Sequence, residues 1–189
     1  MAVSDYTFKL IIVGDASTGK TSLTHRYLSG IFVDSPRLTI GVDFFSKKIK
    51  LENGKRVKLQ IWDFGGEERY RFLLPTYSKG ANGALILYDI TAKKTIYHIP
   101  DYVKIIRENA GDIPIMLVGS KIDLEEHREV STDEGIQAAK KNALASFAEL
   151  SSKTNINIEE SFKTIVDLII QHQEIDDDDK ENGELTTIS

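Results

Sequence analysis

The sequence predicts an α/β fold of three layers, in which helices cover both faces of a six-stranded, mostly parallel sheet. Short runs rich in apolar and β-branched residues alternate with segments of helical periodicity, and strands separated by helices require the crossover connections of a parallel sheet. Runs without polar alternation are typical of strands that are covered on both faces. The expected parallel strands are residues 7–13, 57–62, 83–89, 113–119 and 146–151.

One edge of this sheet is predicted to be antiparallel. Residues 42–62 form two polar-alternating stretches around Asn53-Gly54, and Asn-Gly between such stretches is the strongest short signal for a hairpin. One of the expected helices has Ser131 as its N-cap and Glu134 at the spacing of a capping box. The expected helices are at about residues 20–29, 68–78, 94–109, 132–142 and 157–173.

Length and composition favour a single domain, at residues 1–173, followed by an acidic tail. The 189-residue chain contains no cysteine, which excludes disulfides, thiolate metal sites and prenyl or palmitoyl anchors on the sequence as given. Residues 174–189 carry seven acids and one lysine and are predicted to be disordered. Without these residues the chain is nearly neutral, so we expect no nucleic-acid partner. No apolar run is long enough to span a bilayer, and we expect a cytoplasmic protein without a stable membrane anchor.

A phosphate-binding loop is predicted between the first strand and the first helix. Gly14, Gly19, Lys20 and Thr21 match the pattern G-x-x-x-x-G-K-[ST] in the strand–helix context that this motif requires. Glycines let backbone N–H groups point inward, and the helix N-terminus adds partial positive charge there. We expect Lys20 to reach the β and γ phosphates and the Thr21 hydroxyl to occupy one Mg²⁺ position. The expected phosphate-binding residues are Asp15, Ala16, Ser17, Thr18, Gly19, Lys20, Thr21 and Ser22.

Two later motifs favour guanine as the base. Asp123, at the end of "GSKIDL", can accept from both the ring N–H and the exocyclic amine of guanine, a donor pair that adenine lacks. The stem of Lys121 can lie along the base, and the backbone N–H of Ser152 in "ELSSK" can donate to a carbonyl. Both motifs follow strands, where ligands of this fold class bind. The expected base-binding residues are Ser120, Lys121, Asp123, Ser151, Ser152 and Lys153.

Residues between these motifs are placed to sense a γ-phosphate. The hydroxyl of Thr39 in "LTIGVDF" can complete a Mg²⁺ shell, and Asp63 in "WDFGG" can hold a metal-bound water. The N–H of Gly66 can face the γ-phosphate, and Phe32 can pack against the nucleotide. With Thr21, these assignments predict a metal site formed by Thr21, Thr39 and Asp63.

In order, the motifs "GDASTGKT", "TIGVDF", "WDFGGEERYR", "GALILYDIT", "GSKIDL" and "ELSSK" resemble the Ras superfamily of small GTPases, and most of all its Rab branch, over about residues 6–172. The resemblance implies a P-loop NTPase fold (G-domain), GTP/GDP and Mg²⁺ as cofactors, and a monomeric GDP/GTP switch. Loops at about 31–42 and 64–78 would order when γ-phosphate and Mg²⁺ contacts form. Effectors, exchange factors and GTPase-activating proteins would bind through residues 31–45 and 62–78.

The resemblance also implies residue roles. Lys20, Thr39, Gly66 and Glu67 take the positions of the catalytic groups, and Phe44, Trp62 and Tyr77 match an aromatic trio that forms an effector-reading surface. The alternative for each aromatic taken singly is sheet or core packing.

Several positions depart from the family pattern, including Leu150 and Ser152, which replace threonine and alanine. Ser120 replaces an asparagine whose amide ties the base loop to the phosphate loop, and the loss of this amide predicts weaker guanine binding. Glu67 replaces the water-orienting glutamine, which predicts slow intrinsic hydrolysis. The C-terminal cysteines of most Rab proteins are absent.

Three functions remain open at the level of sequence. The leading interpretation is a GTPase switch. A nucleotide-binding scaffold with negligible hydrolysis is the alternative that Glu67 and Ser120 favour, and an ATPase or small kinase is the one that "SKID" and "SSK" disfavour. A further hypothesis places Arg37, two residues before Thr39, as an arginine finger supplied in cis, against the alternative of a solvated charge.

Overall fold

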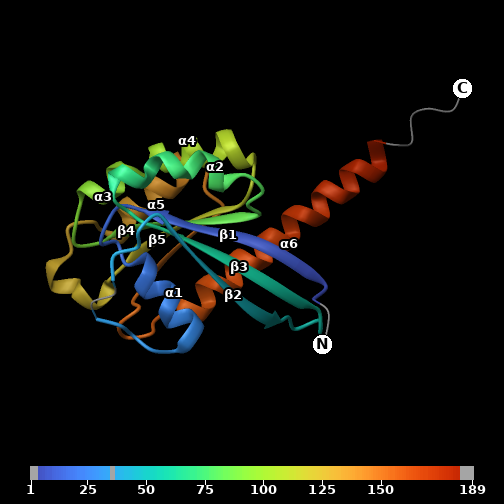
Figure 1. The fold of residues 1–189 in the computed structure, drawn as a ribbon. Coiled ribbons are helices and arrows are strands. Elements are labelled where there is room, and N and C mark those ends of the chain that lie inside the picture. The colour runs from blue at the N-terminus through green and yellow to red at the C-terminus, as the bar shows by residue number, and fades with distance from the viewer. Residues whose placement is uncertain (1–3, 35–36, 184–189) are drawn as a thin grey trace, which may run out of the picture.

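The computed structural model describes residues 4–34 and 37–183, with residues 176–183 described by their backbone alone (Figure 1). Its six strands lie in the order β2-β3-β1-β4-β5-β6, and all neighbours are parallel except β2 and β3. The predicted α/β sheet with one antiparallel edge is therefore confirmed. The strands are β1 (Tyr6–Gly14), β2 (Val42–Lys50), β3 (Arg56–Phe64), β4 (Gly83–Asp89), β5 (Ile115–Ser120) and β6 (Ser146–Leu150).

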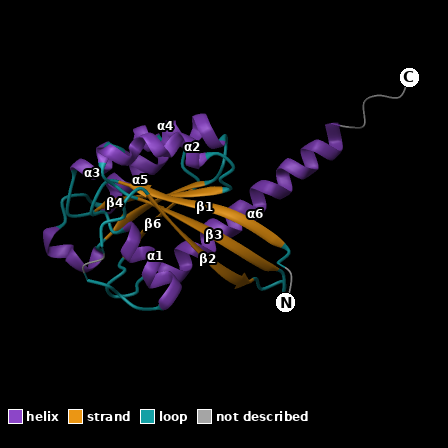
Figure 2. Ribbon diagram, viewed as in Figure 1, coloured by secondary structure: helices purple, strands orange, loops and turns teal. Residues whose placement is uncertain are grey.

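Helices cover both faces of the sheet (Figure 2). Two of the predicted helices differ in detail. The segment expected at 68–78 begins as a 3-10 helix, and the one expected at 94–109 is divided at His98, because Pro100 starts a new helix more readily than it continues one. The α-helices are α1 (Lys20–Ser29), α2 (Leu74–Ser78), α3 (Lys94–Tyr97), α4 (Ile99–Ala110), α5 (Thr132–Lys141) and α6 (Ile158–Gly183), and the 3-10 helices are η1 (Glu68–Leu73) and η2 (Ile122–His127).

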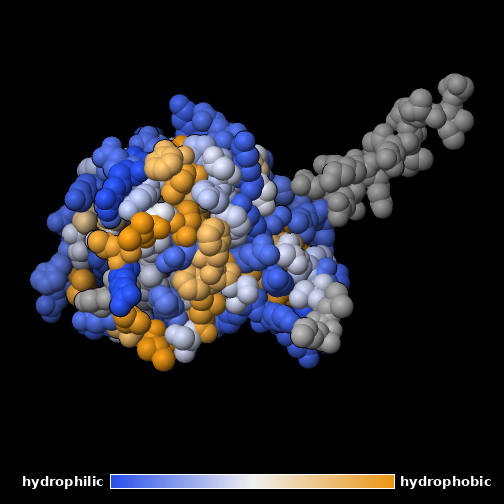
Figure 3. Space-filling model, in the orientation of Figure 1, coloured by the Kyte–Doolittle hydropathy of each residue, from blue (hydrophilic) through white to orange (hydrophobic). Residues whose placement is uncertain are grey.

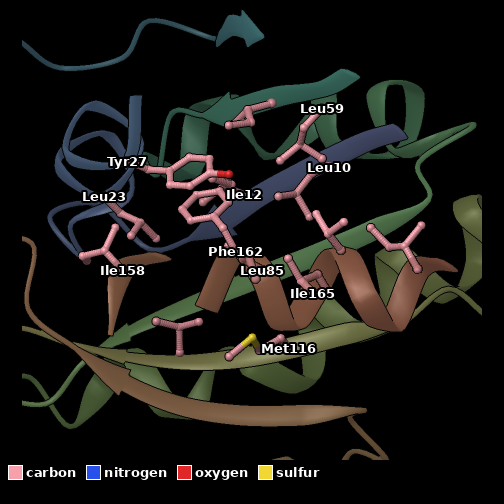
Figure 4. Close-up of a cluster of buried hydrophobic side chains, with 14 of the residues drawn as sticks. Leu10, Ile12, Leu23, Tyr27, Leu59, Leu85, Met116, Ile158, Phe162 and Ile165 are labelled. Atoms are coloured by element: carbon pink, nitrogen blue, oxygen red, sulfur yellow. The ribbon is translucent and has the colours of Figure 1, made fainter. Parts of the chain in front are cut away.

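Alternation along the strands separates the core into two layers. Leu10 and Ile12 of β1 point to the face covered by α1 and α6, whereas Ile11 and Val13 point to the face covered by α2 to α5. In the first layer the rings of Tyr27 and Phe162 stack with their centroids 3.6 Å apart (Figure 4). This stack fixes α1, which begins at the phosphate loop, against α6.

The last helix is longer than expected. We predicted a helix over 157–173 and an irregular tail from residue 174, but α6 continues to Gly183 and projects away from the sheet (Figure 1). The physical reason is that no proline interrupts this stretch and its first glycine stands at its end. The remainder of the predicted tail, 184–189, lies outside the described residues. Within the described part of the chain, no helix is both long and apolar enough to cross a membrane.

The predicted capping box opens α5. The Ser131 hydroxyl accepts from the Glu134 N–H at 3.2 Å, and the Glu134 carboxylate accepts from the Ser131 N–H at 2.9 Å. We expect Ser131→Ala to lower the free energy of unfolding by about 1 kcal/mol, the typical effect of losing an N-cap, measured by urea denaturation. Gln137→Ala, on the exposed middle of the same helix, is the control. Equal stability of the two variants would contradict this capping role.

The topology brings the carboxyl ends of five strands to one edge of the sheet. The parallel strands β1, β3, β4, β5 and β6 end there at Gly14, Phe64, Asp89, Ser120 and Leu150. Ligands of open α/β sheets bind outside these carboxyl ends. The motifs predicted from the sequence follow these strand ends and therefore meet in space.

Candidate functional site

A cavity of about 460 Å³ opens at this edge of the sheet, a volume in the range of small-molecule sites. Most of the predicted site residues line it, although they come from distant parts of the chain. Those that line it are Ala16, Ser17, Gly19, Lys20, Thr21, Ser22, Phe32, Thr39, Gly66, Glu67, Ser120, Lys121, Asp123, Ser152 and Lys153. Arg37, for which we considered a role in cis, lines it too.

Four predicted residues are not part of this lining. Thr18 holds the phosphate loop, since its hydroxyl donates to the Asp15 carbonyl at 2.9 Å. Ser151 donates to the Asp123 carboxylate, and Asp63 is buried beside Thr21. The Asp15 carboxylate instead bonds to side chains outside the cavity. These four residues support the site from behind or through the backbone.

Backbone geometry shapes the phosphate loop. A side chain at Gly14 would place its Cβ 2.3 Å from the Leu87 carbonyl oxygen, and φ at this residue is 144°, so only glycine fits. Ser17 and Gly19 also have positive φ, at 64° and 89°. The chain thereby curls around its own N–H groups immediately before α1, the arrangement that holds phosphate at a helix N-terminus.

Lys20 lies inside this curl. Its ammonium donates to the Asp15 carbonyl at 2.7 Å and to the Thr18 hydroxyl at 3.5 Å. Burial lowers the pKa of Lys20 to about 8, while the nearby Asp63 and Asp15 carboxylates raise it and partly oppose that effect. Both of these hydrogen-bond partners are uncharged, so neither neutralises the positive charge of the ammonium. That charge can therefore stabilise a phosphate.

The three residues predicted to hold a metal converge. The Thr21 hydroxyl donates to Asp63 Oδ2 at 2.7 Å and lies 2.9 Å from the Thr39 hydroxyl. The other carboxylate oxygen of Asp63 is buried without a hydrogen-bond partner among the described residues. Burial raises the pKa of Asp63 to about 6, and the Thr21 hydrogen bond and Lys20 lower it in part. A nearby cation would stabilise the charged form of this buried carboxylate. The carboxylate and the two hydroxyls are hard oxygen ligands of the kind that Mg²⁺ prefers.

The base-binding loops are joined by short hydrogen bonds. The Ser151 hydroxyl donates to Asp123 Oδ1 at 2.6 Å, which orients the carboxylate. Lys121 has a left-handed backbone (φ 68°), and its ammonium pairs with Asp89 at 2.5 Å. The Ser151–Asp123 bond holds the two predicted guanine-reading loops together at the ends of β5 and β6, and the Lys121–Asp89 pair ties the first of them to the end of β4.

Ser120 connects the base loop to the phosphate loop although the asparagine amide of the family pattern is absent. Its hydroxyl lies 2.7 Å from the Thr18 carbonyl oxygen and 2.8 Å from the Tyr88 carbonyl oxygen, and can donate to either. The short side chain suffices because the end of β5 lies directly beside both carbonyls. A hydroxyl therefore makes the connection between base loop and phosphate loop for which the family pattern uses an amide.

The two switch segments pack on the phosphate loop and on each other. A Cβ at Gly66 would lie 2.4 Å from the Asp15 carbonyl group, so this glycine approaches the loop backbone directly. The Gly65 N–H donates to the Gly41 carbonyl at 2.8 Å, and a Cβ at Gly65 would lie 2.5 Å from the Thr39 carbonyl oxygen. Because Gly65 and Gly66 have no side chain, the segment after β3 can pack directly against the backbone of Thr39 and of the phosphate loop.

Sequence reasoning missed several partners of the site. The Asp15 carboxylate accepts from Tyr102 at 3.0 Å and Arg71 at 3.2 Å and lies 2.6 Å from His98 Nδ1. Arg69 forms a bidentate pair with Glu67, at 2.9 and 3.1 Å. No motif links positions so far apart as Asp15 and Tyr102, whereas the closeness of Arg69 to Glu67 was visible in "EER".

An apolar surface adjoins the cavity. Phe44 contacts Trp62 edge-on, with the ring centroids 4.4 Å apart, and the ring centroids of Tyr77 and Trp62 are 5.5 Å apart. Phe44 is 56% exposed, and hydrophobic side chains gather on the face that carries β2 and β3 (Figure 3). The aromatic trio is therefore a contiguous cluster with an exposed member rather than three separate core residues. Leu38, Ile40 and Phe72 are also exposed.

A mostly parallel sheet whose first strand leads through a glycine-rich loop to a helix, with a buried lysine at the start of that helix, defines the class of P-loop nucleotide-binding proteins. A model of the Ras family matches residues 9–171. The chain belongs to the Ras family. It is a small GTPase, which binds guanine nucleotides, hydrolyses GTP and acts as a molecular switch.

Similarity to Rab proteins extends over nearly the whole chain. The Ras-related protein Rab-10 of Diplobatis ommata is 39% identical over 184 residues, covering 97% of this chain and 91% of the relative. The GTP-binding protein ypt3 of Schizosaccharomyces pombe is 44% identical over 163 residues, covering 86% and 75%. The Ras-related protein Rab-1 of Theileria parva is 42% identical over 163 residues, covering 85% and 73%. The predicted Rab-like member of the Ras superfamily is confirmed.

Proposed function

We propose that the cavity binds GTP and GDP with Mg²⁺, and that the convergence of Thr21, Thr39 and Asp63 beside Lys20 is the core of the switch. The observation that carries the proposal is the Asp63 oxygen that is buried here with no hydrogen-bond partner in the part of the chain that the structure describes. Lys20 and the phosphate-loop N–H groups bind the β and γ phosphates. Ser120, Lys121, Asp123 and Ser152 bind guanine.

Magnesium is held in this proposal by the Thr21 and Thr39 hydroxyls, with Asp63 bound directly or through water. Held by these residues, the ion would supply positive charge that neutralises the phosphate groups. Thr39 belongs to the first switch loop, so its hydroxyl joins the site only when that loop closes. The existing 2.9 Å approach of Thr39 to Thr21 supports a closed arrangement of this kind.

Hydrolysis needs positioning and charge stabilisation more than covalent chemistry. Gly66 rests against the phosphate loop, where its N–H can face a γ-phosphate, and Glu67 lines the cavity next to it. We propose that Glu67 accepts a hydrogen bond from the attacking water. Its pairing with Arg69 holds the carboxylate and offsets part of its charge.

The proposed catalysis is tested by single-turnover assays with GTP and with ATP, together with mass spectrometry of the nucleotide that co-purifies. We expect GDP or GTP in the purified protein and slow, Mg²⁺-dependent release of phosphate from GTP alone. Turnover of ATP at the same rate would overturn the guanine assignment. Binding of GTP with no release of phosphate would support the alternative, a nucleotide-binding scaffold, which Glu67 favours.

The state-dependent role of Thr39 gives a separate prediction. Thr39→Ala should abolish the difference in hydrogen exchange across residues 31–42 between the GDP complex and a complex with a non-hydrolysable GTP analogue, because the closing hydroxyl is gone. GDP affinity should change by less than about threefold, since that complex does not use Thr39. Thr39→Ser, which keeps the hydroxyl, is the control. If wild-type exchange is the same in both complexes, Thr39 is not the sensor.

We further propose that effectors, exchange factors and GTPase-activating proteins bind through residues 31–45 and 62–78, which contain the exposed aromatic cluster. The protein acts as a cytoplasmic monomer in this proposal, with a role in trafficking supported by its Rab relatives. Pull-down with each nucleotide complex tests it, and equal capture of partners by both complexes would count against the switch surface.

A further inference from the structure

Arg26 joins the end of α1 to the base-binding loop through three backbone carbonyls. Its Nε donates to the Ser152 carbonyl at 2.6 Å and Nη2 donates to the Lys153 carbonyl at 2.8 Å. Its Nη1 donates to the Gly30 carbonyl at 2.6 Å. Arg26 does not line the cavity, whereas Ser152 and Lys153 do. Its guanidinium therefore holds the loop from the side away from the ligand.

These contacts orient the peptide groups of the loop. In a trans peptide the C=O and the following N–H point in opposite directions. With the Ser152 carbonyl on Arg26, the N–H of Lys153 points away from Arg26. Arg26 also binds the Lys153 carbonyl, so the peptide groups on both sides of Lys153 cannot rotate without breaking a hydrogen bond, and the loop that contains Ser152 and Lys153 is held in place.

A second connection leads toward the first switch loop. The Gly30 N–H donates to the Arg26 carbonyl at 2.9 Å, while the Gly30 carbonyl accepts from the Arg26 side chain. Gly30 is thereby held from both sides at the end of α1. Two residues later Phe32 lines the cavity, and its ring lies 5.8 Å from the Arg26 guanidinium.

We infer that Arg26 is a positioning residue for guanine, which pre-orders the 152–153 loop so that its N–H groups meet the carbonyl oxygen of the base. The inference rests on the proposed role of Ser152. A loop held in its bound conformation loses less entropy on binding, so the nucleotide dissociates more slowly. Only the planar fork of arginine donates in three fixed directions, and lysine cannot replace it.

The test is the dissociation rate of GDP from the full chain, followed by stopped flow. We expect Arg26→Ala to release GDP about tenfold faster, and Arg26→Lys to restore little of this, because the lost contacts are directional hydrogen bonds. Arg107→Ala is the matched control. Like Arg26, Arg107 lies in the last turn of its helix and donates to backbone carbonyls, at Ile113 (2.5 Å) and Gly111 (3.5 Å), but it belongs to α4 and lies outside the cavity lining.

Two analogues separate positioning from general loosening. 6-Thioguanosine diphosphate keeps the ring N–H and the amine but replaces the carbonyl oxygen by a weak acceptor, whereas inosine diphosphate keeps the carbonyl and lacks the amine. We expect Arg26→Ala to accelerate release of the inosine nucleotide as much as of GDP, and of the thio nucleotide by less than about twofold. Equal acceleration of all three, or of none, would overturn the inference.

The same dissociation rates distinguish an error in the role of Arg26 from an error in the proposed base-binding role of Ser152. If the wild-type protein releases GDP and its 6-thio analogue at the same rate, the carbonyl contact proposed for Ser152 is absent and the inference falls with it. If the wild type discriminates but Arg26→Ala leaves that ratio unchanged, only the role of Arg26 is wrong. Arg26→Gln replaces Arg26→Ala in every arm if the alanine variant does not fold.

Discussion

Replacing Asp123 by asparagine is expected to weaken binding of GDP and GTP by about a thousandfold and to strengthen binding of xanthosine diphosphate. The carboxylate accepts from two guanine donors at once, so an amide in its place loses one charge-assisted bond and turns a donor toward a donor. Xanthine carries a carbonyl where guanine carries the amine, and the new amide complements it. The structure favours a large effect because Ser151 already orients Asp123 at 2.6 Å.

The measurement is competitive binding of GDP, xanthosine diphosphate and ADP to the wild type and to Asp123→Asn. Asp133→Asn, on the exposed first turn of α5, makes the same chemical change away from the cavity and should leave all three affinities unaltered. An Asp123→Asn protein with wild-type preference for GDP over the xanthosine nucleotide would show that Asp123 does not read the base. Equal wild-type affinity for ADP and GDP would exclude guanine selection altogether.

Glu67→Gln is expected to accelerate intrinsic GTP hydrolysis by about a hundredfold. A glutamine can accept from the attacking water and donate toward the γ-phosphate, whereas a carboxylate only accepts and adds negative charge. The loss of one transition-state donor costs about 3 kcal/mol, equivalent to that factor in rate. Arg69 pairs with Glu67 at 2.9 Å, which offsets part of the repulsion but supplies no donor from Glu67 itself.

A single-turnover comparison at saturating Mg²⁺ measures this effect. Glu68→Gln, one residue further and exposed, is the control for the change in charge and should leave the rate within about twofold of wild type. The opposing mechanism is that a carboxylate, as the stronger acceptor, polarises the water better. A slower Glu67→Gln protein would establish that mechanism and make Glu67 the working water-positioning residue.

Local sequence information was sufficient to predict the features that depend on residues close together in the chain. The glycine-rich loop was predictable because the curl, the lysine and the helix N-terminus lie within a few residues. Asn53-Gly54 predicted the hairpin, and Ser131 with Glu134 predicted the cap of α5, for the same reason. The end of α6 was predicted too early, because local charge indicated an irregular tail while nothing in the sequence interrupts the helix before Gly183.

Contacts across the fold were decided by the tertiary structure. The sequence determined by itself that a phosphate loop, two base-reading motifs and two switch segments follow one another between strands, because strand and helix periodicity and loop glycines are local properties. Only the packed sheet placed Thr21, Thr39 and Asp63 within hydrogen-bond distance, brought Ser120 onto the Thr18 carbonyl and set Arg26 behind the base loop. Such contacts require segments up to 127 residues apart in the sequence to be placed to within a few tenths of an ångström. This placement arises from packing of the whole core and leaves no periodic signal in the chain.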